Sequence, residues 1–195
     1  MKKLAVLGSG RGDNFEAIAE YFESKDVEIT CISDNLNSDI ILKAREKGIN
    51  TKYLPFTETA EYFGVRSFDL IALSDYRQKL SDEILELGRF INIHPALLPA
   101  FKGEDAIYRA FHAGVKVSGV TVHQVKSEPD GGKIIAQYPV LIGNTTHFDE
   151  FEKEIHSLEN ILYPRVIETI LDDKVFDFTN LFRGHSCGGN CGGCH

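Results

Sequence analysis

The sequence predicts an α/β fold with a mostly parallel, open sheet, helices on both faces and an antiparallel hairpin at one edge. Short apolar runs alternate with amphipathic stretches from Leu4 to His112. This alternation is typical of parallel strands joined by helices that cover the sheet. Two β-rich runs then follow with only a short loop between them, which indicates a hairpin. Together these patterns predict a Rossmann-like architecture.

The predicted strands are short apolar runs that end at polar or glycine-containing loops. In chain order we expect them at Leu4–Leu7, Val27–Ser33, Thr51–Leu54, Leu70–Leu73, Phe90–Ile93, Val117–Val125 and Lys133–Leu141. Only Pro55–Phe68 separates the third strand from the fourth, which is near the minimum for a crossover between parallel strands. The helix in that connection is therefore expected to be short.

The predicted helices follow apolar residues spaced three and four apart. The first begins at Asn14, with Phe15, Ile18, Ala19 and Phe22 on one stripe. Later helices are expected at Ile40–Glu46, after the Ser81 cap with Ile84, Leu85 and Leu87 inward, at Asp105–His112 and from His147 to Leu171. Pro164 is expected to kink or break the last helix.

Length and charge restrict the kinds of partner. A chain of 195 residues can bury one full core, and its net charge is −8 with scattered basic residues. This balance argues against nucleic acid and anionic membranes as partners. No apolar run approaches the ~20 residues of a membrane span, and the run that starts at Leu4 is too short for a signal peptide. We expect a cytoplasmic protein that acts on small molecules, and leave a homodimer open.

A polar pair ends the fifth predicted strand. Asn92 and His94 are two residues apart, so their side chains point to the same face of the sheet. Pro95 and Pro99 prevent further strand pairing, and the carboxyl ends of parallel strands are where ligands bind. Asp130 is a candidate third member. An amide donor, a titratable ring and a carboxylate suffice for acyl transfer, although a strand-end Asn and His also serve to cap backbone groups.

The segment from Asn92 to Pro99, with its Asn-x-His-Pro-x-Leu-Leu-Pro motif, and the downstream Asp130-Gly131-Gly132 resemble the core of the folate-dependent formyltransferases. The resemblance covers most of residues 1–171 and gives a formyltransferase-like domain at residues 1–180. It implies an enzyme that passes the formyl group of 10-formyltetrahydrofolate to a primary amine, with glycinamide ribonucleotide favoured and a place in purine biosynthesis. The catalytic roles fall on Asn92, His94 and Asp130. A related enzyme that formylates another amine or hydrolyses the donor, and a non-catalytic metal or redox module, stay open.

A glycine-rich turn joins the first strand to the first helix, and such a turn lets backbone N–H groups approach an anion. The resemblance implies that it binds the phosphate of the ribonucleotide through Gly10, Arg11, Gly12, Asp13 and Asn14. Asp13 replaces the family's serine, and its carboxylate repels a phosphate unless Arg11 or a metal compensates. Asp13 or Asn14 could instead only cap the helix. Glu159 matches a family glutamate near the amine substrate, or is a solvated helix residue.

The resemblance also places the folate against the segment from Leu73 to Leu80. This segment is polar here, so we assign cofactor contacts to Tyr76 and Leu80, and to Gly131 beside the candidate carboxylate. His123 matches a family histidine near the catalytic residues, but as a lone histidine on a strand it is expected to be structural rather than catalytic.

The last stretch, residues 181–195, differs in composition and is interpreted as a Gly/Cys-rich tail. Cys187, Cys191 and Cys194 have the spacing of metal ligands, which predicts zinc or an iron–sulfur cluster. The alternative is a flexible tail with reduced thiols. Candidates for a fourth ligand are His185, His195 and Cys31.

Overall fold

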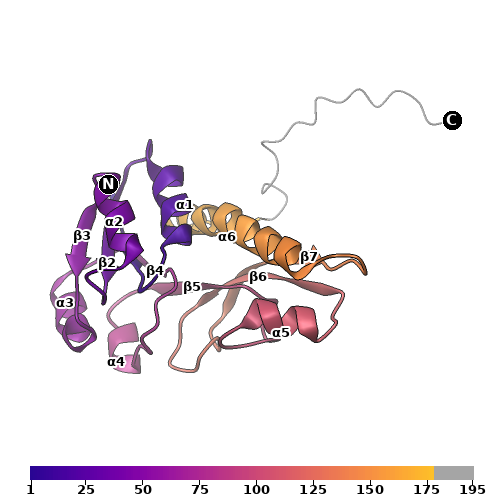
Figure 1. Ribbon diagram of the computed structural model, residues 1–195. Helices are drawn as coiled ribbons and strands as arrows, with labels where there is room; N and C mark the ends of the chain where they lie inside the picture. The colour runs from indigo at the N-terminus through magenta and orange to yellow at the C-terminus, as the bar shows by residue number, and fades with distance from the viewer. Residues whose placement is uncertain (178–195) are drawn as a thin grey trace.

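The structure, a computed structural model, describes residues 1–177. The tail at residues 181–195, with its predicted metal ligands, lies outside the described residues. Within the described part, a seven-stranded sheet has the order β3-β2-β1-β4-β5-β6-β7 (Figure 1). Its strands are β1 Lys2–Leu7, β2 Val27–Ser33, β3 Asn50–Tyr53, β4 Leu70–Leu73, β5 Phe90–His94, β6 Val117–Gln124 and β7 Ile134–Leu141. The first five pair in parallel, and β6 and β7 are antiparallel, which confirms the predicted fold class.

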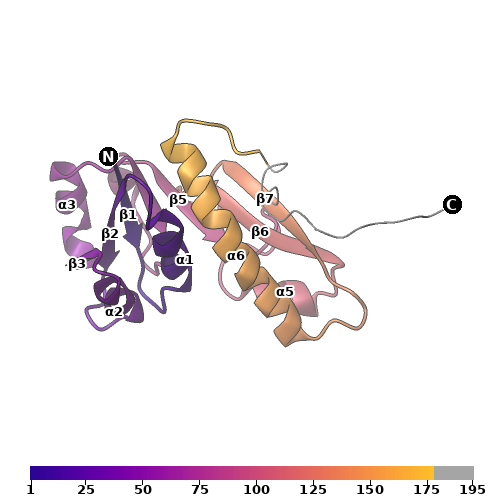
Figure 2. The same cartoon turned by 90° about the horizontal axis from the view of Figure 1, so that it is seen from above.

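Helices cover both faces of the sheet (Figures 1 and 2). One apolar cluster joins the sheet to α1, α2, α5 and α6, and a second cluster on the other face joins it to α3 and α4. The helices are α1 Asp13–Phe22, α2 Asp39–Glu46, α3 Thr59–Val65, α4 Asp82–Leu85, α5 Ala106–His112 and α6 Phe148–Leu171, with a short 3-10 turn η1 at Phe56–Glu58. The change of face falls between β1 and β4, where the strand order reverses, and in open α/β sheets this reversal opens a crevice.

Two expectations about the helices are wrong. Leu87 is 39% exposed, because α4 ends at Leu85 and residue 87 lies beyond its apolar stripe. Pro164 does not break α6, which is continuous to Leu171. A proline removes only one backbone hydrogen bond of a helix, here the bond to the Asn160 carbonyl, and the buried neighbours Tyr163 and Val166 hold this turn against the sheet. The connection between β3 and β4 is short, and its helix, α3, has only seven residues, as we expected.

A buried tyrosine fixes α6 to the strand ends beneath the crevice. The Tyr163 side chain is fully buried, and its hydroxyl donates to the Leu73 carbonyl at 2.9 Å while lying 3.2 Å from the Ile91 carbonyl. These carbonyls belong to β4 and β5, the two strands whose ends carry Ser74 and Asn92. The helix that carries Glu159 is therefore held in a set position relative to β5. No helix within residues 1–177 is both long enough and apolar enough to cross a membrane.

Candidate active site

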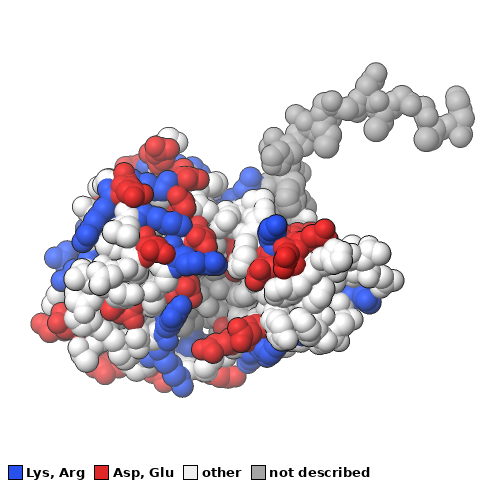
Figure 3. Space-filling model, in the orientation of Figure 1, with Lys and Arg blue, Asp and Glu red and all other residues white. Residues whose placement is uncertain are grey.

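A cavity of about 1050 Å³ opens at the carboxyl ends of β1, β4 and β5. Figure 3 shows this face of the molecule hollowed near its middle, with basic and acidic side chains around the hollow. The cavity brings together segments far apart in the sequence. Its lining includes the predicted residues Arg11, Gly12, Asp13, Asn14, Tyr76, Leu80, Asn92, His94, Asp130 and Glu159. Among the predicted residues, Gly10 and Gly131 do not line it.

Those two glycines have backbone roles. A side chain at Gly10 would collide with the Asp75 carboxylate, since a Cβ there would lie 2.0 Å from Asp75 Oδ2. The first turn therefore lies against the segment that follows β4, and a larger residue at position 10 would require the Asp75 side chain to move. A Cβ at Gly131 would lie 2.7 Å from the side-chain carboxyl carbon of Glu128. Gly131 closes the turn that presents Asp130. Both glycines therefore shape the backbone beside the cavity, and their predicted ligand contacts stay predictions.

Strand pairing explains why the polar residues of β5 meet a histidine of β6. Asn92 is directly opposite His123, and His94 is opposite Thr121. Residues directly opposite on neighbouring strands point to the same face, so the side chains of Asn92, His94 and His123 share one face. All three line the cavity, and His94 and His123 are buried.

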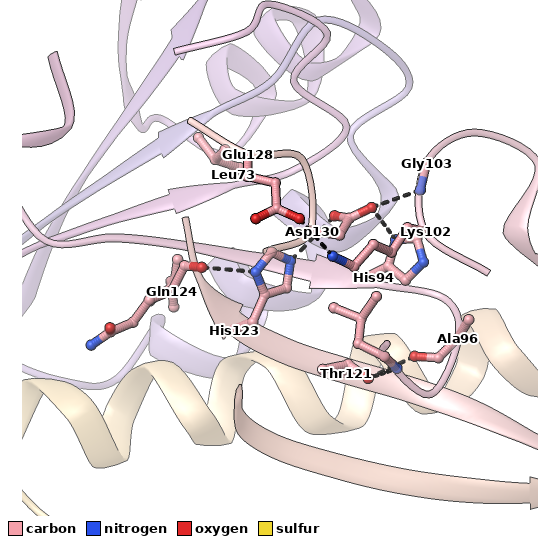
Figure 4. A network of polar contacts seen from close by, with 12 residues as sticks. Leu73, His94, Ala96, Lys102, Gly103, Thr121, His123, Gln124, Glu128 and Asp130 are labelled. Carbon is pink, nitrogen blue, oxygen red and sulfur yellow. Dashed lines mark hydrogen bonds and ion pairs between the residues drawn. The ribbon is translucent and has the colours of Figure 1, made fainter. Parts of the chain in front are cut away.

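Asp130 lies between the two imidazoles (Figure 4). His94 Nδ1 is 3.5 Å from Asp130 Oδ2, and His123 Nε2 is 3.5 Å from Asp130 Oδ1. The backbone N–H of Gly103 donates to Asp130 Oδ2 at 2.8 Å. At 3.5 Å the two histidine contacts are ion-pair distances rather than good hydrogen bonds, and among the described residues His123 Nε2 has no hydrogen-bond partner. One carboxylate thus serves both rings.

The far nitrogen of each ring is fixed by a backbone carbonyl. His94 Nε2 lies 3.0 Å from the Phe101 carbonyl, and His123 Nδ1 lies 2.8 Å from the Gln124 carbonyl. A carbonyl only accepts, so each of these nitrogens carries a hydrogen. In His94, the nitrogen that faces Asp130 is then the position at which the ring gains or loses a proton. This arrangement resembles the orienting carboxylate and ring of general acid–base sites.

Burial lowers the pKa of His94 below its usual value, against the opposing charge of Asp130. The side chain is almost fully inside the protein and its contact with Asp130 is long, so the effect of burial outweighs the attraction of that carboxylate. The ring is therefore neutral at neutral pH in the free protein, which is suited to accepting a proton rather than holding one. The pKa of Asp130 is lowered to about 2, first by the His123 imidazole, against the effect of burial, with the Gly103 N–H and the His94 charge adding to it.

The carboxylate in the first turn is already neutralised. Asp13 pairs with Lys43 Nζ at 2.9 Å and with Arg11 Nη2 at 3.3 Å, and the hydrogen bond from Lys43 lowers its pKa. Gly12, the N-cap of α1, has φ 73°, so the turn needs glycine there. Because two cations offset Asp13, the amino end of α1 remains a suitable place for an anion. Lys43, on α2, is a compensating charge that sequence reasoning did not identify.

An ion pair on α6, between His156 and Glu159, lines the cavity near the first turn. His156 Nδ1 lies 2.8 Å from the buried Glu159 carboxylate, and that hydrogen bond raises the pKa of His156. Both residues line the cavity beside Arg11. His156 was missed because a lone histidine on a helix carries little information; the signal was its spacing of three residues from Glu159, which places both on one helix face.

Another part of the cavity wall is apolar and belongs to the segment that follows β4. Leu80 is buried, and Tyr76 is half-buried, with desolvation raising its pKa to about 12. A ring that keeps its proton is a neutral surface against which a flat heterocycle can stack. Among residues 1–177, no group of three or more His, Cys, Asp or Glu side chains is arranged to hold a metal ion.

Comparisons with known proteins agree with this geometry. The model of the Formyl transferase family matches residues 2–167. A phosphoribosylglycinamide formyltransferase of Bacillus subtilis is 37% identical over 186 residues, which are 88% of this chain and 95% of that protein. The crystal structure of glycinamide ribonucleotide transformylase 1 from Geobacillus kaustophilus has a TM-score of 0.81 and 34% identity, with 88% of this chain and 99% of that chain covered. Formyltetrahydrofolate deformylase 2 of Arabidopsis thaliana is 32% identical over 78% of this chain and 50% of its own length.

The fold and the cavity define an enzyme of the α/β class with a carboxylate, imidazole and amide site at the strand ends. The match over most of the chain shows that the protein belongs to the formyl transferase family, as the motif around Asn92 and His94 led us to expect.

Proposed function

We propose that this enzyme transfers the formyl group of 10-formyltetrahydrofolate to the primary amine of glycinamide ribonucleotide. The observation that carries the proposal is the convergence of Asn92, His94 and Asp130 at one cavity, with His94 Nδ1 3.5 Å from Asp130 Oδ2. The similarity to phosphoribosylglycinamide formyltransferases over nearly their whole length supports the choice of substrates.

The ribonucleotide fits the end of the cavity at the first turn. Its phosphate would lie at the amino end of α1, near Arg11 and within the field of Lys43. Glu159 and His156 face that end and offer hydrogen bonds to hydroxyl or amine groups of the substrate. The folate would lie against Tyr76 and Leu80 of the segment that follows β4.

The reaction needs an amine to lose a proton and a leaving nitrogen to gain one. As the amine attacks the formyl carbon, negative charge develops on the formyl oxygen, and the Asn92 amide N–H is placed to donate to it. His94 takes the amine proton at Nδ1, where Asp130 stabilises the imidazolium that forms. The same proton then goes to N10 of the folate as the carbon–nitrogen bond breaks. A ring whose pKa is lowered by burial can both accept and return this proton near neutral pH.

Hydrolysis of the formyl donor is the second candidate, and the similarity to a plant deformylase supports it. In that reaction water would occupy the place of the amine and the same three groups would act. The two candidates differ in their requirement for the ribonucleotide.

The test is to incubate the protein with 10-formyltetrahydrofolate in the presence and absence of glycinamide ribonucleotide, and to follow formation of tetrahydrofolate by absorbance. We expect turnover only when the ribonucleotide is present. Turnover at the same rate without it would support the hydrolase and overturn the proposal.

A further inference from the structure

Arg109 contacts three backbone carbonyls of the loop between β5 and α5. This residue is exposed, on α5, and outside the candidate catalytic set. Its Nε donates to the Glu104 carbonyl at 3.0 Å. Its Nη2 donates to the Phe101 carbonyl at 2.9 Å and to the Lys102 carbonyl. A guanidinium has five N–H donors in a rigid fork, so one side chain can fix several carbonyls at once, and lysine cannot reproduce this geometry.

The segment that Arg109 holds has an unfavourable backbone conformation. Phe101 has φ 55°, Gly103 has φ 83° and Asp105 has φ 53°. Left-handed backbone is natural for glycine but rare for an aromatic residue such as phenylalanine. Strained backbone of this kind persists only where surrounding contacts determine it, and such strain gathers at functional sites. Arg109 supplies contacts on both sides of Gly103.

The same segment makes direct contact with two of the three catalytic candidates. The Phe101 carbonyl accepts from His94 Nε2 at 3.0 Å, and the Gly103 N–H donates to Asp130 Oδ2 at 2.8 Å. The Phe101 carbonyl therefore has two donors, His94 and Arg109. One loop thus determines which nitrogen of His94 carries the hydrogen and how the Asp130 carboxylate is turned.

We propose that Arg109 is a positioning residue for the formyl transfer: it fixes the loop from Phe101 to Glu104 so that His94 and Asp130 keep their reactive geometry. The inference rests on the proposed function only for its activity readout, because the contact between Gly103 and Asp130 can be observed without turnover. Small displacements of catalytic groups reduce the chemical step more than substrate binding. We call the hydrogen bonds from Arg109 to this loop the clamp. Loss of the clamp should therefore lower kcat with little change in KM.

The experiment compares Arg109→Ala and Arg109→Lys with the wild-type enzyme, and uses Tyr108→Ala as the matched control on the same helix. The control removes an exposed side chain that stacks on His112 and meets Phe148 edge to face, away from the carbonyls that Arg109 contacts. We expect roughly tenfold or greater loss of kcat in both arginine variants, with KM for each substrate within about twofold of wild type. The control should keep wild-type kcat.

Hydrogen exchange of the Gly103 amide, measured by NMR on the full chain without substrates, is the second readout. We expect exchange to become at least roughly tenfold faster in both arginine variants at unchanged melting temperature, since the loop can then leave Asp130. Wild-type kcat in Arg109→Lys would overturn the clamp, because charge alone would then suffice. Unchanged Gly103 exchange in Arg109→Ala would also overturn it. A wild-type enzyme that fails to use the ribonucleotide would refute the proposed function, while the exchange result still decides the clamp.

Discussion

His123 and His94 share a single carboxylate: the nearest nitrogen of each ring lies 3.5 Å from a different oxygen of Asp130. Each ring is fixed on its far side by a backbone carbonyl, so neither can turn away without losing a hydrogen bond. The consequence is that Asp130 is held from three directions, by two rings and by the Gly103 N–H. A carboxylate constrained in this way is a good orienting group for proton transfer.

Removing the charge of Asp130 should abolish most of the activity. In Asp130→Asn the group that stabilises the His94 imidazolium is neutral, and we expect kcat to fall by roughly 10²- to 10⁴-fold. Steady-state kinetics checks this, with Glu128→Gln as the matched control, since that carboxylate lies in the same loop and is 71% exposed. An Asp130→Asn enzyme that folds and retains more than a tenth of wild-type kcat would contradict the proposed role.

Asp130 should also make stability depend on pH in the acid range. Its pKa is about 2 in the folded protein, below the value of 3.8 expected for the unfolded chain. A lowered pKa stabilises the fold above the unfolded value, and this contribution is lost as the pH falls from about 4 towards 2. The difference corresponds to roughly 2 kcal/mol. Urea unfolding between pH 5 and pH 2 should show a steeper loss for wild type than for Asp130→Asn, and parallel curves would contradict this.

Removing a negative or a positive charge at the first turn should change the affinity for the ribonucleotide in opposite directions. Asp13→Asn removes a negative charge near the expected phosphate, frees Arg11 from its ion pair and leaves Lys43 paired with Glu16, so we expect Kd for glycinamide ribonucleotide to fall by roughly two- to tenfold. Lys43→Met leaves Asp13 with less compensation, and Kd should rise by a similar factor. Titration calorimetry at low salt measures both. Equal effects of the same sign would place the phosphate elsewhere.

His156 should make ribonucleotide binding depend on pH. The hydrogen bond to Glu159 raises the pKa of His156. The ring is therefore charged at pH 6 and loses its charge as the pH rises through this raised pKa. The other charges near the ring include Glu152 on α6 and Arg11 and Asp13 at the first turn. We expect His156→Gln to raise Kd roughly three- to tenfold at pH 6 and far less at pH 9. The matched control is His112→Gln on α5. This variant should bind the ribonucleotide with wild-type Kd at both pH values.

The sequence predicted most of the fold and only part of the site. The apolar runs and the two prolines after His94 identified β5 and the direction of its polar side chains, because strand periodicity is local information. Asp130 was predicted as a catalytic residue from the family resemblance and from the two glycines that follow it. The role of His123 depends on strand register, which is set by pairing between residues distant in the sequence. The role of Arg109 depends on a loop with left-handed backbone and on the contact of that loop with Asp130, which is 27 residues from Gly103. Local pattern could not supply them. Lys43 belongs to the same class, since its pairing with Asp13 depends on how α2 packs against α1.

The most direct test follows the formyl carbon itself. The protein is mixed with 10-formyltetrahydrofolate labelled with ¹³C in the formyl group, with and without glycinamide ribonucleotide, and the products are identified by ¹³C NMR. Our account predicts that the label appears in the N-formyl ribonucleotide when the amine is present, that labelled formate stays at the uncatalysed level without it, and that Asp130→Asn forms neither. Labelled formate released at the same rate with and without the ribonucleotide, and no labelled amide, would contradict the account.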